Sequence, residues 1–219
     1  MKYLNIIYQN ILYLSMSRFL QIEKNNEDVR ITILTNLIKM MTERKLLDKN
    51  NKDNNIKKLI EQKSDEDIYQ IDLNNNDKMY TKLLPHKITA ISKTFGIIDF
   101  LNNFKDNPKI MIVKSISKKA HQYVSNNYPN TEIFVEEDLM INLIENELVP
   151  KHIPLDEEEI KLFYEKYNCK KKNVPKMLST DPIAKYYNLK PGDVCRIIRP
   201  SEATGFINSY RLVIKGAFK

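Results

Sequence analysis

One short apolar run, Ile-Met-Ile-Val at 110–113, constrains the fold of this chain more than any other feature. A continuous run bounded by lysines is typical of a strand buried on both faces, because a half-exposed strand alternates apolar and polar residues. Apolar residues recur at helical spacing before the run, over 89–104, and after it, over 117–128. A buried strand between two helices predicts an α/β layer in this part of the chain.

The remaining elements are predicted from the same periodicities and from turn-forming residues. Helices are predicted over 29–47, 56–66, 89–104, 117–128 and 156–167, with a short one after residue 181. Strands are predicted over 78–85, 109–117 and 131–138, with a hairpin over 193–213. The Asn-rich segments 48–55 and 72–77 are predicted loops. The predicted fold class is α/β, of the α+β kind, with a second small α+β unit at the C-terminal end.

The charge of the chain is unevenly distributed. The 219 residues carry a net charge of +7, and the last 50, from Lys170 onward, contain 11 basic and three acidic residues. Such a region meets an acidic protein surface or a phosphate backbone, or it is a solvated face. The hydrophobic content of 42% is enough for one large domain or two small ones, each with a core.

The cysteine content disfavours a disulfide scaffold and a zinc site. Cys169 and Cys195 are the only two cysteines, and they are too far apart to form a Cys-x-x-Cys pair. This pattern is typical of a protein from a reducing compartment.

The first 20 residues resemble a signal peptide in composition, but their pattern argues against one. Asn5, Gln9 and Asn10 interrupt the apolar run, and no small-residue cleavage site follows. The segment is too short and too polar to span a membrane. It is predicted to be an amphipathic helix, with translation from Met16 as the alternative.

Two helix starts can be read from local capping signals. Asp156, followed three residues later by Glu159, predicts a capping box, and the prolines at 150 and 154 end regular structure before it. Asp181 is placed to cap a second helix, and Pro182 suits the first helical position because its missing N–H costs nothing there.

No constellation of catalytic residues is found. The four glycines form neither a dinucleotide-binding fingerprint nor a phosphate-binding loop, and the three histidines at 86, 121 and 152 are isolated in sequence. The acidic clusters at 136–138 and 156–159 lie at predicted helix starts, where the helix dipole explains them without a metal. Glu159 and Lys161 have the Glu-x-Lys spacing that many nucleases use. Those nucleases need the pair on a strand with another carboxylate near, whereas here it lies on a predicted helix. We therefore predict no catalytic residue, no metal ligand, no cofactor and no small-molecule substrate.

An ordered set of motifs in the C-terminal third carries a resemblance to a known family. The motifs are LVPKH at 148–152, VPKM at 174–177, DPIAK at 181–185, GDV at 192–194, RIIRPS at 196–201 and YRLV at 210–213. In this order they resemble the fifth-largest subunit shared by the three eukaryotic nuclear RNA polymerases, whose archaeal counterpart consists of the C-terminal domain alone.

The resemblance covers roughly residues 29–214 and is strongest from about 136. Toward the N-terminus it weakens: where the family has Arg-Gly-Tyr after its first helix, this chain has Arg44, Lys45 and Leu46. The resemblance implies an N-terminal extension at 1–25, a non-catalytic jaw domain of restriction-endonuclease-like fold at 26–146, an assembly domain at 147–214 and a tail at 215–219.

In function, the resemblance implies a subunit of a DNA-directed RNA polymerase that performs no chemistry itself. Its partners would be the largest subunit, neighbouring small subunits and downstream duplex DNA, with no membrane. The biased composition favours a large DNA virus as source, and hence the virion and the cytoplasmic viral factory of the host. A cellular source would instead imply the nucleus.

Candidate residues follow from the motifs that match the family. The expected partner-interface residues are Pro150, His152, Asp181, Pro182, Arg196, Arg199, Pro200, Tyr210 and Arg211. A jaw should contact phosphates rather than bases, and the expected DNA-proximal residues are Lys114, Lys118 and Lys119. The alternative is a stand-alone nuclease or nucleic-acid-binding protein of nuclease-like fold.

Overall fold

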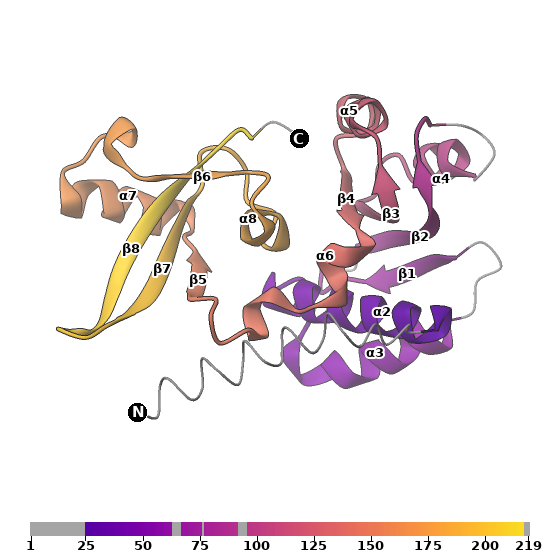
Figure 1. Cartoon of the computed structure of the whole chain (residues 1–219), viewed down its shortest axis with the longest axis horizontal. Helices are drawn as coiled ribbons and strands as arrows, with labels where there is room; N and C mark the ends of the chain where they lie inside the picture. The colour runs from indigo at the N-terminus through magenta and orange to yellow at the C-terminus, as the bar shows by residue number, and fades with distance from the viewer. Residues whose placement is uncertain (1–24, 63–66, 76, 92–95, 217–219) are drawn as a thin grey trace, which may run out of the picture.

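The computed structural model describes residues 25–62, 67–75, 77–91 and 96–216 (Figure 1). The predicted helix in the first 20 residues and the alternative start at Met16 lie outside the described residues, as does the end of the predicted tail. Within the described ranges, none of the helices combines the length and apolarity needed to cross a membrane.

The first of two sheets is built around the predicted buried strand. Its four strands, in the order β1-β2-β3-β4, are β1 (Ile68–Asp72), β2 (Lys78–Ile88), β3 (Lys109–Ile116) and β4 (Thr131–Val135). β1 is antiparallel to β2, whereas β2, β3 and β4 are parallel. β3 is thus flanked on both sides, and its apolar run is fully buried, as predicted.

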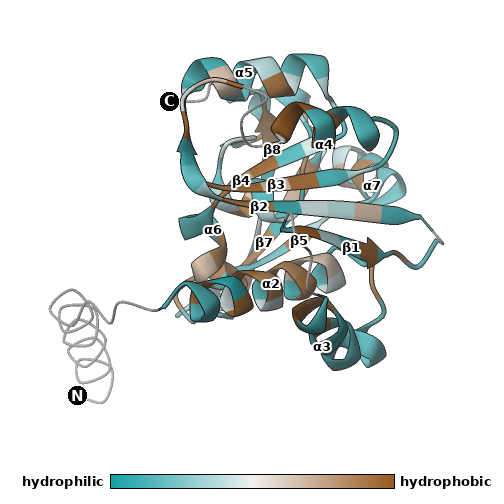
Figure 2. Cartoon of the chain, turned by 90° about the vertical axis from the view of Figure 1, so that its right-hand side faces the viewer, coloured by the Kyte–Doolittle hydropathy of each residue, from teal (hydrophilic) through white to brown (hydrophobic). Residues whose placement is uncertain are grey.

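Helices cover both faces of this sheet (Figures 1 and 2). One face carries α2 (Asn26–Glu43), α3 (Lys52–Glu61) and α6 (Glu136–Met140), and the other carries α4 (Ile97–Asn103) and α5 (Lys118–Asn127). Side chains alternate along β3, so Ile110 and Ile112 pack in the core under α2, while Met111 and Val113 pack in the core under α4 and α5.

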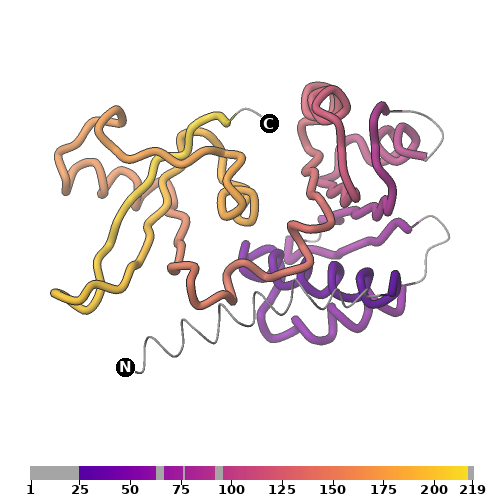
Figure 3. Tube along the Cα trace, in the orientation of Figure 1, coloured from indigo at the N-terminus to yellow at the C-terminus, as the bar shows by residue number. Residues whose placement is uncertain are grey.

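The second sheet has the order β5-β7-β8-β6. Its strands are β5 (Lys151–Pro154), β6 (Lys176–Leu178), β7 (Val194–Ser201) and β8 (Gly205–Ile214). α7 (Glu157–Tyr167) packs through Phe163 on a core with Val194 and Leu212, and α8 (Pro182–Tyr186) packs on a core with Cys195 and Val213. The described chain passes between the sheets once, through residues 141–150 (Figure 3). Short 3-10 turns are η1 (Lys49–Asn51), η3 (Leu143–Glu145) and η4 (Lys171–Asn173).

The predicted helix at 89–104 is wrong in extent. β2 continues to Ile88, because its parallel pairing with β3 extends to the partners Ile88 and Ile116. α4 begins only at Ile97, after Gly96, whose φ of 60° lies in the left-handed region that ends rather than continues a helix. The described part of the segment between them, residues 89–91, forms a bend.

Further differences concern element ends and short strands. The Asn-rich segment predicted as a loop at 48–55 is largely helical, because Asp48 accepts from the N–H of Asn50 and starts η1, which leads into α3. α3 ends at Glu61, earlier than predicted. β1 and β6 were not predicted, and the strand predicted over 131–138 ends at Val135, because the acidic residues that follow start α6. The prolines at 150 and 154 flank an unpredicted edge strand, since β5 follows Pro150 and ends at Pro154, and proline is tolerated on an edge strand.

Both predicted caps are confirmed. The N–H of Glu159 donates to Asp156 Oδ1 at 2.8 Å, and the N–H of Asp156 donates to Glu159 Oε2 at 3.2 Å. At α8, the N–H of Ile183 donates to Asp181 Oδ1 at 2.9 Å, and Pro182 is the first helical residue.

α2 ends in a Schellman motif formed without glycine. The N–H of Leu46 donates to Met41 O and the N–H of Lys45 to Thr42 O, each at 3.0 Å, which is the pairing that defines the motif. Lys45 takes the left-handed position with φ of 62°, where glycine is the usual residue.

Arg44 joins the two sheets at this helix end. Its guanidinium donates to both carboxylate oxygens of Glu132 on β4, at 2.9 and 2.8 Å. It also donates to the carbonyl oxygens of Lys185 and Tyr186 at the end of α8, at 2.9 and 2.7 Å. Asn188, which follows α8, donates to the same Glu132 at 3.0 Å. One side chain therefore ties α2 and β4 to the module of the second sheet.

Candidate docking and nucleic-acid surfaces

The hairpin β7–β8 has two faces set by its register. Arg196 is opposite Tyr210, and Cys195 is opposite Arg211, so each arginine faces a different side of the sheet. The face with Arg196 and Tyr210 lies under α7, and the face with Cys195 lies over α8. Near the base of the hairpin, two helices of the same chain therefore cover the apolar residues on both faces.

The far end of the hairpin extends beyond both helices (Figure 1). Phe206 is 72% exposed and Ile207 is 53% exposed, and they lie on opposite faces because they are consecutive. Arg199 and Pro200 are exposed opposite them. Pro200 lies in β7 rather than in the turn, which comprises residues 202–204 and closes at Gly205 with φ of 73°. We call Arg199, Pro200, Phe206 and Ile207 the hairpin tip.

The other candidate residues of the hairpin are engaged within the chain to different degrees. Tyr210 packs on Phe163 and Tyr167 of α7, with ring centroids 4.5 and 5.5 Å apart. Arg211 donates to the carbonyl oxygen of Lys176, 3.2 Å away. Arg196 is half-buried, and its Nε is buried without a hydrogen-bond partner.

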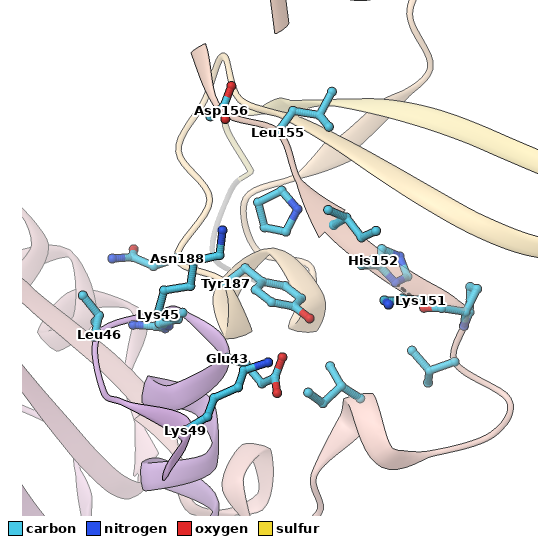
Figure 4. Close-up of a pocket in the computed structure, with 16 residues that line it drawn as sticks. Glu43, Lys45, Leu46, Lys49, Lys151, His152, Leu155, Asp156, Tyr187 and Asn188 are labelled. Carbon is cyan, nitrogen blue, oxygen red and sulfur yellow. Dashed lines mark hydrogen bonds between the residues drawn. The ribbon is translucent and has the colours of Figure 1, made fainter. Parts of the chain in front are cut away.

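Pro150 and His152 line a groove between the two sheets, with a volume of about 800 Å³ (Figure 4). His152 Nδ1 lies 2.6 Å from the carbonyl oxygen of Pro150 and donates to it, because a carbonyl can only accept. Burial of the ring lowers the pKa of His152, against a smaller opposite effect of this hydrogen bond. Lys45, Lys49 and Lys151 contribute exposed cations to the groove.

Asp181 and Pro182 have a local role that sequence motifs alone cannot separate from a docking role. Asp181 caps α8 through the N–H of Ile183, and Pro182 is exposed at the first helical position. The cap satisfies an N–H group that the helix itself leaves unpaired.

The three candidate DNA-proximal lysines lie near one edge of the first sheet but not on one face. Lys114 follows Ile112 on the face of β3 that carries α2, and it lines a pocket of about 440 Å³ with Glu136. Lys118 and Lys119 are the first residues of α5, on the opposite face. All three are exposed, and the structure brings only Lys118 and Lys119 together.

Sequence reasoning missed other charged residues at this edge. Lys87 lies near the end of β2 opposite Ser115 of β3, and it is exposed. Glu27 from the start of α2 lines the same pocket as Lys114 and Glu136. The parallel pairing of β2, β3 and β4 was the signal that could have found Lys87 and Glu136, because the carboxyl ends of parallel strands meet at one edge.

The nuclease-like spacing of Glu159 and Lys161 lies on α7, as predicted. On β3, the residue two before Lys114 is the buried Ile112, so this strand does not pair a carboxylate with the lysine. Among the described residues, no group of three or more His, Cys, Asp and Glu side chains is placed to hold a metal ion.

Comparison with known proteins gives this geometry its context. Residues 141–213 match the family model described as RNA polymerase Rpb5, C-terminal domain. The chain is 33% identical over 201 residues to DNA-directed RNA polymerase subunit 5 of Acanthamoeba polyphaga mimivirus, covering 89% of this chain and 97% of that protein.

Cellular relatives match over a shorter part. RPABC1 of DNA-directed RNA polymerases I, II and III from Caenorhabditis elegans is 36% identical over 107 residues, which is 48% of this chain and 51% of that protein. The Dictyostelium discoideum protein of the same name is 34% identical over 132 residues, 58% of this chain and 66% of that protein. The predicted resemblance and the assignment to transcription, as a component of a DNA-directed RNA polymerase, are thereby confirmed. The chain belongs to the family of the fifth subunit of DNA-directed RNA polymerases.

Proposed function

We propose that this polymerase subunit docks on the largest subunit through the module of β5–β8 and contributes the module of β1–β4 to the jaw that holds downstream duplex DNA. We place the assembly module at residues 147–214 and the jaw module at 26–146, with a restriction-endonuclease-like fold that is not catalytic. The viral relative supports a site of action in the virion and the cytoplasmic viral factory.

The observation that carries the docking proposal is the hairpin tip. A two-stranded ribbon with apolar side chains on both faces gains little by projecting into water, because burial of each large apolar side chain contributes about 1.5–3 kcal/mol. Phe206 and Ile207 are exposed on opposite faces, so a partner that covers them has to surround the ribbon. Arg199 beside them offers a guanidinium suited to a carboxylate of that partner.

We expect Arg199→Ala to reduce the incorporation of the subunit into the polymerase at least tenfold, and to do so before it affects DNA binding. Arg199 is exposed in the isolated chain, so the free energy of unfolding of the isolated variant should change by less than about 0.5 kcal/mol. Co-purification of the tagged subunit with the largest subunit measures incorporation.

Lys170→Ala is a suitable control, because it removes an exposed cation of the same module away from the hairpin tip. Its incorporation should be normal. Normal incorporation of Arg199→Ala would contradict docking through the hairpin tip, and metal-dependent DNA cleavage by the purified subunit would favour the nuclease alternative.

The start of α5 carries the DNA part of the proposal. Lys118 and Lys119 are exposed on the first turn, where the backbone N–H groups lack partners in the helix and the helix dipole favours anions. Ser117 caps only one of these N–H groups, because its hydroxyl accepts from the N–H of Ala120 at 3.2 Å. A phosphate at this end would meet both the lysines and the remaining N–H groups.

We expect the Lys118→Ala/Lys119→Ala variant of the assembled polymerase to bind downstream DNA less tightly at low salt. The slope of log K against log[salt] should become shallower by about 0.9 for each phosphate that the variant no longer neutralises. Lys114→Ala should have a smaller effect, because Lys114 shares its pocket with Glu136. Binding isotherms at several salt concentrations give the slope.

The matched control is Lys57→Ala/Lys58→Ala, which removes two exposed lysines from α3, on the other face of the sheet. An unchanged slope in the Lys118/Lys119 variant, or the same change in both variants, would refute the proposed phosphate contact.

A further inference from the structure

A shallow pocket lies where α7 crosses the hairpin, away from the hairpin tip; it shares only Leu155 with the groove between the sheets. Its volume is about 180 Å³, and it is formed by residues of α7, the residue Leu155 ahead of that helix, β7 and β8. The residues that line it are Leu155, Glu159, Leu162, Phe163, Lys166, Tyr167, Arg196 and Tyr210.

The rim of the pocket is apolar and uncovered. Leu162 is 63% exposed and Tyr167 is 49% exposed, although both belong to the helix that anchors the module through Phe163. Below them, Phe163 and Tyr210 form a floor with ring centroids 4.5 Å apart. An uncovered Leu and Tyr above an aromatic floor are typical of a protein-docking surface, in which aromatic residues are enriched.

Arg196 presents a cation in this apolar setting. It projects from β7 on the α7 side, opposite Tyr210, and its Nε is buried without a hydrogen-bond partner. None of the ion pairs found among the described residues includes Arg196. A buried donor without an acceptor lowers the free energy of unfolding, so the unpaired Nε of Arg196 destabilises the isolated chain.

The polar neighbours within the chain do not neutralise Arg196. Burial and a hydrogen bond with Tyr167 raise the pKa of Tyr210, against smaller lowering effects of the Arg196 charge and of its hydrogen bond to the Tyr210 hydroxyl, so the partner of the guanidinium is a neutral hydroxyl and Nε stays unpaired. Glu159 accepts from the backbone N–H of Asp156 in the capping box of α7. The other charged residue, Lys166, is a second cation. An added carboxylate would therefore complete the pocket, because guanidinium and carboxylate pair in a fork geometry.

We infer that this pocket receives an aspartate or glutamate side chain of the largest polymerase subunit, from a segment whose apolar neighbours cover Leu162 and Tyr167. The inference rests on the proposed docking function and assigns a second anchor to it, separate from the hairpin tip. A protein carboxylate fits better than a nucleic-acid phosphate, because the pocket is small and floored by aromatic rings rather than surrounded by lysines.

The test is Arg196→Met in the full chain, co-expressed with the polymerase subunits. Methionine keeps the long apolar stem and removes the unpaired donor, so the unfolding temperature of the isolated variant should be unchanged or higher. Incorporation with the largest subunit should fall at least tenfold. Arg196→Lys, which keeps the charge but not the fork, should give an intermediate loss.

The other variants separate the possible results. Lys166→Ala, in the same pocket, should lower incorporation by less than threefold. Normal incorporation of Arg196→Met together with a defect in Arg199→Ala would overturn this inference and leave the docking proposal standing. Normal incorporation of both variants would reject the docking proposal itself.

Two further results would also overturn the inference. A lower unfolding temperature of Arg196→Met would assign Arg196 a structural role inside the module. A shallower salt dependence of DNA binding with normal incorporation would assign it to phosphate instead.

Discussion

Arg44→Ala should lower the free energy of unfolding of the chain by about 3–5 kcal/mol, because it breaks a buried ion pair and leaves Glu132 without its cation. The Arg44 side chain is only 5% exposed and that of Glu132 is 22% exposed, so water substitutes poorly for the guanidinium. The variant also leaves the carbonyl oxygens of Lys185 and Tyr186, at the end of α8, without the guanidinium that donates to them. Urea unfolding followed by circular dichroism measures the loss.

The same change should uncouple the two sheets. Arg44, at the end of α2, binds Glu132 in β4, which is 88 positions later in the sequence. It also binds Tyr186 at the end of α8, which is 142 positions later. We therefore expect the variant to unfold in two transitions, with hydrogen exchange faster at α8 than in the buried strand β3. Arg44→Lys should recover only part of the stability, since an ammonium group cannot reproduce the planar fork.

Lys39→Ala is the matched control. Lys39 lies on the same helix and pairs with Glu145 at 2.8 Å, but the two side chains are 24% and 55% exposed. An exposed pair contributes about 0–1 kcal/mol, so the control should stay close to wild type. Equal losses in the two variants would show that burial does not set the strength of the Arg44 contacts.

Local signals predicted the elements whose causes are local. The apolar run of β3 marks a strand buried by its own composition, and the caps at Asp156 and Asp181 act over three residues or fewer. β1 had no comparable signal, because only Tyr69 and Ile71 of its five residues are buried and its strand conformation depends on pairing with β2. Tertiary pairing decides such short edge strands.

The candidate surfaces were predictable in residue type but not in position. Phe206 and Ile207 read as ordinary strand residues, and only the helix positions show that nothing in the described chain covers them. Arg44 reads as a common helix-end arginine, since its partners are remote in sequence. Asp181 matched a family motif, which does not distinguish a helix cap from an interface contact.

Phe163→Ala should cost about 3–5 kcal/mol of unfolding free energy, because the substitution leaves a cavity at the only buried residue of α7. The Phe163 ring contacts Tyr164, Tyr167 and Tyr210, with centroids between 4.5 and 5.3 Å away. Without it, α7 loses its anchor on the second sheet, and the pocket that contains Arg196 loses its floor. Thermal and urea unfolding of the full chain measure the cost.

The neighbouring residue supplies the control for Phe163. Leu162→Ala removes an apolar side chain of similar size from the same helix, but one that is largely exposed, so its unfolding free energy should change by less than about 0.5 kcal/mol. Phe163→Leu should recover most of the loss, because it refills much of the cavity without the aromatic contacts. If Leu162→Ala proves as costly as Phe163→Ala, α7 is held by its outer face, and Leu162 and Tyr167 are not free to meet a partner.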